Sequence, residues 1–207
     1  MVTLRLNLLL IAIGSCCAAG ASDSARMQMG GWQLDASKIN GSYQPNHVVV
    51  FDAVLTQGMD TIHADKAEAA ALDVKDATWY LTGNVQVQVP QGDLMADSAT
   101  VTFREGKVVM ATAHGNPATF MQRTVPGTPP ASGHAKDIAF DVPKGEVKLN
   151  GDAFVTREHN DLTACQIIYN ITQQTVDAQK CENAEEGVHG TIELKSTAPS
   201  SSSGGTK

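Results

Sequence analysis

Short stretches of alternating apolar and polar residues, separated by turn signals, dominate the sequence. The clearest is VQVQV at 85–89, in which three valines alternate with two glutamines. This period of two predicts a β-strand with one buried face. Pro90, Gln91 and Gly92 then have turn chemistry, and a second strand is predicted to start at Asp93. The pattern therefore predicts strand pairs joined by tight turns.

One of these strand pairs occurs twice. The stretch 81–101 aligns without a gap with the stretch 149–169. Chance agreement over this length would give about one or two identities. The identical positions are Leu81, Gly83, Val87, Asp93, Leu94 and Ala96, which match Leu149, Gly151, Val155, Asp161, Leu162 and Ala164. With a fainter partial copy at 51–65, this predicts an array of strand pairs, each roughly 30 to 38 residues long, whose stacking supplies the core.

The rest of the chain extends this all-β pattern. The run 64–72 is rich in alanine, but the repeat aligns it with strand positions, so we interpret it as strand. The segment 123–132 is rich in Pro and Gly and is predicted to be a surface loop. The predicted strands are 32–35, 47–55, 61–69, 78–89, 94–104, 107–113, 117–122, 134–142, 146–157, 162–169 and 175–180, with a last edge strand at 192–194.

The first 21 residues have the features of a signal peptide. An apolar run at 8–13 is followed by the small-x-small sequence AGA at 19–21, so the mature protein is expected to be exported. Alternatively, the sequence IGSC at 13–16 resembles a lipoprotein box that would lipidate Cys16. The expected organisation is a signal peptide at 1–21, a flexible segment at 22–31, one β-domain at 32–195 and a disordered Ser/Gly-rich tail at 196–207.

Two cysteines remain if the leader is removed. Cys165 lies in the predicted strand 162–169 and Cys181 follows the predicted strand 175–180. The hairpin between them would bring the two thiols close, and an oxidising compartment favours their pairing. The alternative is two unpaired cysteines that act as small apolar residues.

Charge and motifs argue against nucleic-acid binding and catalysis. The formal net charge is −7 and the sequence pI is about 5.2, so no basic stripe is available for nucleic acid. The sequence contains no nucleophile elbow, phosphate loop or dinucleotide fingerprint. His63 and His134 occupy equivalent repeat positions, but we interpret each as a strand residue beside a turn. Asp65, Asp97 and Asp137 are likewise interpreted as surface strand ends rather than a cation site, so we expect no enzyme, metal or cofactor.

Three motifs in the second half of the chain follow one another in a distinctive order. GNPATFMQ at 115–122 precedes GHA at 133–135 and LNGDA at 149–153. This order resembles the OstA-like (LptA) family of lipopolysaccharide transport proteins, whose pattern is approximately Gly-x-Pro-Ala-Thr-Phe-x-Gln, Gly-His-Ala and Leu-x-Gly-x-Ala. The segment 51–65 also fits, and the resemblance covers about 32–180. Asp-Ala at 52–53 where the family usually has Gly-Asn, the late cysteines and the serine-rich tail depart from the pattern.

The resemblance implies an antiparallel β-jellyroll, a taco-like pair of sheets open at both ends, whose apolar groove holds the acyl chains of lipopolysaccharide. It also implies a non-enzymatic periplasmic carrier that bridges an LptC-like inner-membrane partner and an LptD-like outer-membrane receptor. The sheet edges near Trp32, Tyr169 and Leu194 are expected to add strands from a partner or a second copy. The expected groove residues are Trp32, Leu34, Phe120, Phe140, Val142 and Phe154.

Three alternatives remain open at the level of sequence. The same apolar side chains could fill a closed sandwich core, as in a structural periplasmic β-repeat protein without a lipid ligand. The chain could also be a membrane-anchored LptC-like partner, if the leader stays in the mature protein. A repeat-built polysaccharide lyase would need a catalytic cluster on one face, which the sequence does not show.

Overall fold

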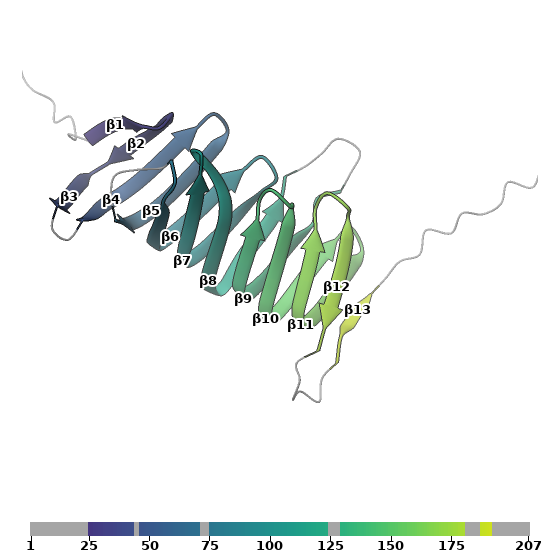
Figure 1. Cartoon of the computed structure of the whole chain (residues 1–207). Coiled ribbons are helices and arrows are strands. Elements are labelled where there is room, and N and C mark those ends of the chain that lie inside the picture. Colours follow the sequence, from purple (N-terminus) through teal and green to yellow (C-terminus); the bar gives the residue numbers. More distant parts are fainter. Residues whose placement is uncertain (1–24, 44–45, 71–74, 124–128, 181–186, 192–207) are drawn as a thin grey trace, which may run out of the picture.

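The computed structural model describes residues 25–43, 46–70, 75–123, 129–180 and 187–191. These residues form one antiparallel sheet in which most strands pair with the next strand in the chain (Figure 1). The strands are β1 (Ala25–Met29), β2 (Trp32–Ala36), β3 (Lys38–Tyr43), β4 (Asn46–Gln57), β5 (Asp60–Ala69), β6 (Thr78–Val89), β7 (Gly92–Arg104), β8 (Lys107–Gln122), β9 (Ser132–Asp141), β10 (Glu146–Arg157), β11 (Asn160–Asn170), β12 (Thr175–Gln179) and β13 (His189–Thr191).

The sheet does not close on itself. Its order is β1-β2-β4-β5-β6-β7-β8-β9-β10-β11-β12, with β3 beside β4 at one end and β13 beside β11 at the other. Figure 1 shows the strands stacked in this order along the long axis of the molecule. The prediction of an all-β antiparallel fold that is built from strand pairs and is open at both ends is confirmed.

Two differences from the predicted strands have simple causes. The segment 22–31 was expected to be flexible, which is wrong for its described part, because β1 pairs along its whole length with β2 and buries Met29. The predicted break at 114–116 is also wrong, since β8 runs through it. Pro117 lies where the β8–β9 register shifts, so its missing N–H interrupts no regular ladder. The expected signal peptide, the 192–194 strand and the 196–207 tail lie outside the described residues.

A line of irregularities crosses the middle of the sheet. Each of the six neighbouring ladders from β5–β6 to β10–β11 contains a register shift. Such bulges bend a strand and increase its local twist. Because the shifts fall side by side in successive strands, the whole sheet bends along one line.

Both copies of the sequence repeat contain this bend. Gly83 and Gly151 both have positive φ, 78° and 74°, and each precedes a second residue with positive φ, Asn84 at 45° and Asp152 at 50°. The β6–β7 register shifts between Thr82 and Val85, and the β10–β11 register shifts at the equivalent residues 150 and 153. Glycine recurs because it adopts this conformation without strain.

The bend folds the sheet over on itself. The indole N–H of Trp32 in β2 donates a 2.7 Å hydrogen bond to the carbonyl of Gly106, beyond the end of β7, and its ring meets Phe103 of β7 edge to face at 5.3 Å. Since β4, β5 and β6 separate β2 from β7 in the sheet, this contact exists only between two facing layers. Tyr169 of β11 and Gln122 of β8 meet in the same way.

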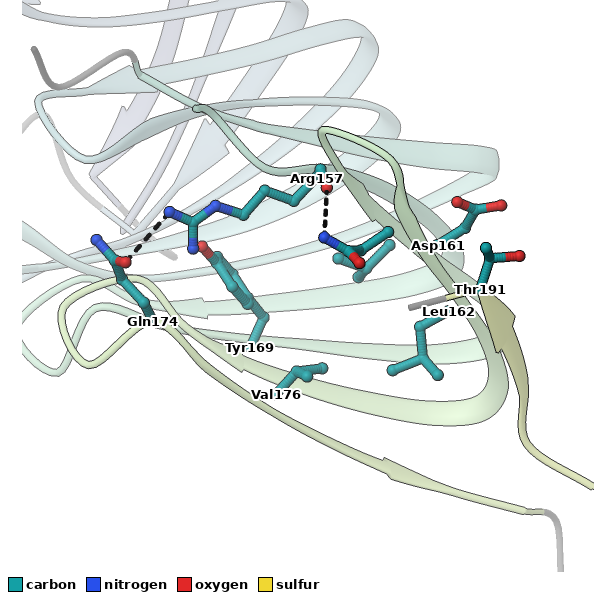
Figure 2. A pocket seen from close by; sticks show the side chains of 9 residues that line it. Arg157, Asp161, Leu162, Tyr169, Gln174, Val176 and Thr191 are labelled. Carbon is teal, nitrogen blue, oxygen red and sulfur yellow. Dashed lines mark hydrogen bonds between the residues drawn. The ribbon is translucent and has the colours of Figure 1, made fainter. Parts of the chain in front are cut away.

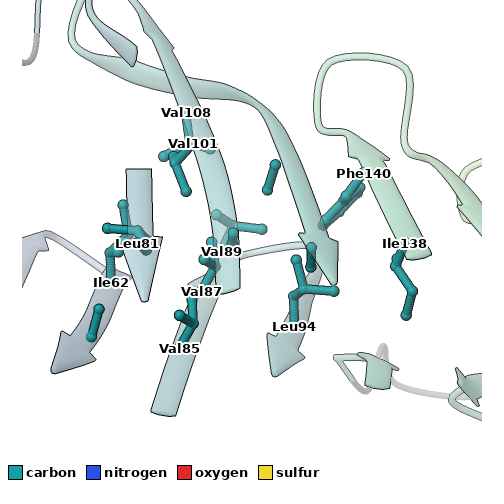
Figure 3. Packing of buried hydrophobic residues seen from close by; sticks show 14 of the residues in the cluster. Ile62, Leu81, Val85, Val87, Val89, Leu94, Val101, Val108, Ile138 and Phe140 are labelled. Carbon is teal, nitrogen blue, oxygen red and sulfur yellow. The ribbon is translucent and has the colours of Figure 1, made fainter. Parts of the chain in front are cut away.

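The core lies between these two layers. Along β6 the inward residues Leu81, Val85, Val87 and Val89 are at most 2% exposed, while their neighbours face outward. Figure 3 shows them packed with side chains from other strands, among them Leu94. One face of each strand is therefore removed from water and the other remains at the surface.

The bend can be tested with two glycine substitutions. A Cβ at Gly83 would lie 2.9 Å from the Cβ of Asp65, whereas a Cβ at Gly58, which also has positive φ, would have nothing within 4 Å. Gly58→Ala is expected to lower the free energy of unfolding by about 1 kcal/mol through backbone strain alone. Gly83→Ala is expected to lower it by about 3 kcal/mol, because the steric overlap adds to the strain. Urea denaturation measures both, and equal losses would contradict a tightly packed bend.

Candidate functional site

Four of the expected groove residues lie in the interior. Trp32 and Leu34 are fully buried, and Phe120 and Phe140 are 3% and 1% exposed. The rings of Phe120 and Phe140 meet edge to face with centroids 5.7 Å apart. The structure therefore brings these two together, but packs them against each other rather than along an open surface.

The other two expected residues are placed differently. Val142 follows the end of β9 and packs against the core while only partly buried. Phe154 is on the outer face, where its ring stacks on His134 with centroids 5.0 Å apart. Ala153 and Val155, its neighbours in β10, are the inward residues. The expectation that Phe154 lines the interior is wrong because successive strand residues face opposite ways, and the alternation of Ala153 and Val155 already carried that signal.

An apolar cavity opens at the C-terminal end of the two layers (Figure 2). Its volume is about 160 Å³. Four apolar or aromatic side chains make its wall, and polar side chains of the β10–β11 turn and of the strand ends make its rim. The lining residues are Val155, Arg157, Asn160, Asp161, Leu162, Tyr169, Gln174, Val176 and Thr191.

The cavity exists because the array stops there. Leu94 in β7 is 2% exposed, while Leu162, its repeat equivalent in β11, is only partly buried. After β7 the chain continues into the long strand β8, whereas the strands beside β11 are the short β12 and β13. The end of a repeat array lacks the neighbour that covers an internal unit. None of the expected groove residues borders this cavity, although the last copy of the sequence repeat lies beside it.

Arg157 places one cation at the rim of the cavity. Its Nε donates to the carbonyl oxygen of Pro129 at 3.1 Å, and its Nη2 donates to Oε1 of Gln174 at 3.1 Å. Figure 2 shows the guanidinium beside the ring of Tyr169. The two hydrogen bonds hold the positive group next to an apolar space, an arrangement suited to a ligand with an apolar body and an anionic head.

Tyr169 connects the cavity wall to the other layer. Its hydroxyl donates to Oε1 of Gln122 at 2.9 Å, and the same oxygen accepts the backbone N–H of Ala131 at 3.3 Å. Gln122 is 4% exposed and is the buried polar residue of the described core. Burial raises the pKa of the Tyr169 hydroxyl above its ordinary value, so the neutral donor form is favoured.

The strands that form the sheet edges are not the expected ones. Trp32 in β2 is covered by β1, and Tyr169 in β11 is covered by β12, so neither lies on an edge strand. The outermost strands are β1 and β3 at one end and β12 and β13 at the other. Leu194 lies outside the described residues.

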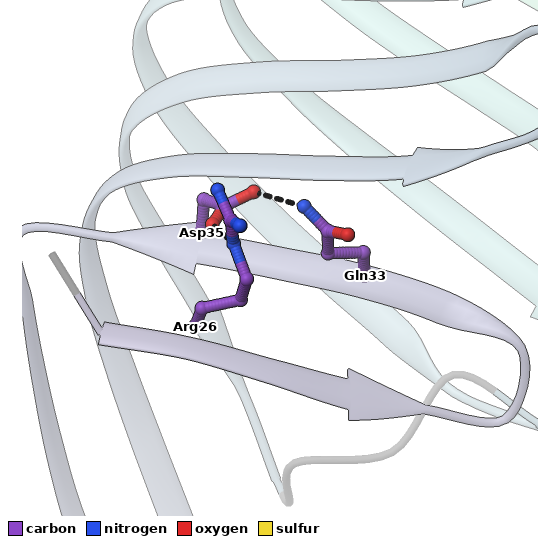
Figure 4. Close-up of polar contacts among 3 residues, drawn as sticks. All are labelled: Arg26, Gln33 and Asp35. Carbon is purple, nitrogen blue, oxygen red and sulfur yellow. Dashed lines mark hydrogen bonds and ion pairs between the residues drawn. The ribbon is translucent and has the colours of Figure 1, made fainter.

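A cluster of polar side chains on the outer face links β1 to β2 (Figure 4). Nε of Arg26 lies 2.6 Å from Oδ1 of Asp35, and Nε2 of Gln33 donates to Oδ2 of the same carboxylate at 2.6 Å. The hydrogen bond from Arg26 lowers the pKa of Asp35 the most, and the hydrogen bond from Gln33 lowers it further. The N-terminal edge is thus held by charge on its outer face and by Met29 on its inner face.

The residues considered for metal binding lie along the bend. Asp65 accepts a 2.8 Å hydrogen bond from Nδ2 of Asn84, and Asp137 pairs with His114. Asp65 and Asp137 lie in mid-strand, so their interpretation as strand ends is wrong. His63 in β5 and His134 in β9 are strand residues, as interpreted. Within the described ranges, no three His, Cys, Asp or Glu side chains are grouped so that they could hold a metal ion.

Cys165 of β11 is disulfide-bonded. Cys181 lies outside the described residues, so the expected Cys165–Cys181 pairing stays a prediction. Between positions 25 and 191, leaving aside the gaps, the chain forms no helix with the length and apolar character to span a membrane.

Comparison with known proteins identifies the family to which this chain belongs. Residues 61–175 match the family model described as LptA/(LptD N-terminal domain) LPS transport protein. The chain belongs to this family. The match spans β5 to the start of β12, and so includes the bend, the buried aromatic pair and most of the cavity.

Individual members of the family are distant relatives. "Lipopolysaccharide export system protein LptA" of Escherichia coli K12 is 30% identical over 120 residues, 56% of this chain and 63% of that protein. The chain thus matches less than two-thirds of that protein's length. "Lipopolysaccharide export system protein LptH" of Pseudomonas aeruginosa is 27% identical over 123 residues, 58% of this chain and 69% of that protein.

A solved structure shows the same fold. The crystal structure of LptH, described as the LptA homologous periplasmic component of the lipopolysaccharide transport device from Pseudomonas aeruginosa, superposes with a TM-score of 0.54 at 22% identity. The match covers 64% of this chain and 94% of that one. At this identity the likeness supports the family's fold for this chain, and the family's β-jellyroll expectation agrees with the folded-over sheet.

The hydrogen bond between the layers can be tested at Tyr169. Tyr169→Phe is expected to lower the free energy of unfolding by about 1 kcal/mol, because Gln122 loses a donor while buried. Tyr80→Phe, at a residue that is 58% exposed, is the matched control and should change stability by less than about 0.5 kcal/mol. Because its folded pKa is raised, Tyr169 contributes stability below about pH 10 that is lost as the pH rises. The difference between wild type and Tyr169→Phe should therefore shrink above that pH.

The N-terminal edge can be tested by titration. Replacing Arg26 with Met removes the hydrogen bond and the charge that lower the pKa of Asp35, so this pKa should rise toward about 3.9. A lowered pKa gives stability that is present above the ordinary value and lost as the pH falls through the folded value. NMR titration of the carboxyl groups measures the change, with Asp152, which pairs with Lys136, as the internal control. An unchanged Asp35 would contradict the role of Arg26.

Proposed function

We propose that this protein is a non-enzymatic periplasmic carrier that binds the acyl chains of lipopolysaccharide between its two layers. The observation that carries the proposal is the apolar cavity with Arg157 at its rim, at the open end of the layers, in a chain of an LPS transport family. The names of the Escherichia coli and Pseudomonas aeruginosa relatives as lipopolysaccharide export proteins support it.

The size of the cavity limits what it holds at once. A cavity of about 150 Å³ binds one benzene-sized group in a well-studied protein core, so about 160 Å³ takes a short alkyl segment. Each buried methylene contributes about 0.8 kcal/mol. A whole acyl chain therefore enters from this mouth and separates the layers further in, displacing contacts such as that between Phe120 and Phe140.

Charge supports an orientation for the ligand. The protein carries a formal net charge of −7, so long-range attraction does not draw in an anionic lipid. The apolar part provides most of the binding energy, and Arg157 offers a local partner for a phosphate at the rim. The apolar part then points toward Tyr169 and Val155 and the anionic part toward solvent.

The partners follow from the open edges. An LptC-like inner-membrane partner and an LptD-like outer-membrane receptor would add strands at opposite ends, one at β1 and β3 and the other at β12 and β13. Self-association of the chain would occur at the same two ends of the sheet. Strand addition suits these edges because main-chain hydrogen bonds provide the affinity.

One observation favours a second candidate. The interior around Phe120 and Phe140 is closed and packed, as in a structural periplasmic β-repeat protein without a lipid ligand. The two candidates differ in whether lipid reaches Leu162 and Phe140 in cells.

Photocrosslinking distinguishes these candidates. A photoreactive phenylalanine analogue is placed at Leu162 in the cavity wall, at Phe140 in the interior, and at Met95 on the outer face as a control, where the side chain is 49% exposed. We expect lipopolysaccharide adducts at Leu162 and Phe140 and none at Met95. Adding Arg157→Gln should reduce the Leu162 adduct by about tenfold or more, since a charge-assisted contact is worth about 1.5–3 kcal/mol. A folded, exported protein that gives no adduct at Leu162 would support the structural candidate.

A further inference from the structure

The C-terminal edge of the sheet is divided between two short strands. β12 pairs with β11 from Gln166 to Asn170, and β13 pairs with it from Asp161 to Thr163. The disulfide-bonded Cys165 lies between the two paired stretches. The N-terminal end has the same arrangement, because β3 and β2 pair with separate halves of β4. Each end therefore presents one short strand on either side of the bend.

β13 contributes little packing to the molecule. All three of its residues are exposed. Thr191, which pairs with Asp161, lies at the rim of the cavity of about 160 Å³ (Figure 2), and His189 borders a second cavity, of about 520 Å³. Because its side chains are exposed, β13 is held mainly by its ladder with β11. A strand of this kind can be displaced at low cost.

The fit of β13 on β11 depends on one glycine. A Cβ at Gly190 would press against the carbonyl oxygen of Asp161, closer than real Cβ atoms approach, and would also lie 3.1 Å from Cδ1 of Leu162. Gly187, two residues before β13, would meet nothing within 4 Å. The sequence therefore has a glycine where the close approach to β11 requires it.

We propose that β13 is a displaceable cap on the strand-addition edge of β11, and that it limits the addition of a second copy of this chain. A second copy that extends both layers must pair on both sides of the bend, and β13 occupies one of these sides. Natural sheets protect their edges in this way against unwanted pairing. The cap must leave β11 before the neighbour's edge strand can pair with Asp161–Thr163.

This inference rests on the edge pairing in the proposed function but not on its lipid ligand. The test therefore measures the cap and the association separately, with no lipid present. Hydrogen exchange of the amides of residues 161–163 reports whether β13 covers β11. Sedimentation of the mature chain under non-reducing conditions reports self-association.

The decisive variant is Gly190→Ala, and Gly187→Ala is its matched control. We expect Gly190→Ala to speed hydrogen exchange of the amides of residues 161–163. We also expect it to tighten self-association roughly tenfold, because a β13 that covers β11 about nine-tenths of the time weakens the apparent affinity by that factor. Gly187→Ala should match wild type in both measurements. Thr191→Pro, which removes a backbone donor from β13, should behave like Gly190→Ala.

Each other outcome overturns the proposal. If exchange at 161–163 speeds up and association does not change, the uncovered edge takes no second copy. If Gly190→Ala leaves exchange unchanged, β13 does not cap β11. If Gly187→Ala associates as tightly as Gly190→Ala, the effect does not come from the cap. Lipid crosslinking at Leu162 with normal association in all variants would retain the carrier and reject the cap.

Discussion

The line of register shifts across the sheet is the constraint on which the other features depend. A flat sheet of these strands would expose one continuous apolar face, because the core residues of neighbouring strands lie on the same side. The bulges bend the strands from β5 to β11, so the sheet buries that face against itself. Gly83 and Gly151 permit the bend at two repeats, where a side chain would meet Asp65 or Lys136. The core, the cavity at the end of the layers and the divided edges all follow from this bend.

An open array has ends that its internal units do not have. Inside the array each strand is covered by a full-length neighbour, and residues such as Leu94 are removed from water. At the C-terminal end the neighbours of β11 are short, which leaves Leu162 and Tyr169 around a cavity and leaves backbone groups for pairing. Ligand entry and strand addition would thus meet at the same end, a few residues apart on β11.

A packed interior and a carrier function are compatible if the layers separate at low cost. Many inward positions are alanine, including Ala64, Ala67, Ala111 and Ala113, and alanine buries little area across the interface. The large rings that join the layers are few, and Trp32 with Phe103 lies at the opposite end from the cavity. An acyl chain that enters at Leu162 would replace weak alkyl contacts with similar ones.

The sequence by itself determined the strands, the repeat and the family resemblance. Alternation in segments such as 85–89 sets which side of a strand is apolar, and this local property survives in any tertiary arrangement. The same rule placed Phe154 outside once Ala153 and Val155 were inside, although the residue type alone suggested the reverse. The tertiary structure decided which inward residues touch, which strands became edges, and where a space remained. These features depend on how far the sheet bends and on which strands are neighbours. The bend and the strand order arise from contacts between residues far apart in the chain, such as Trp32 with Gly106 and Tyr169 with Gln122.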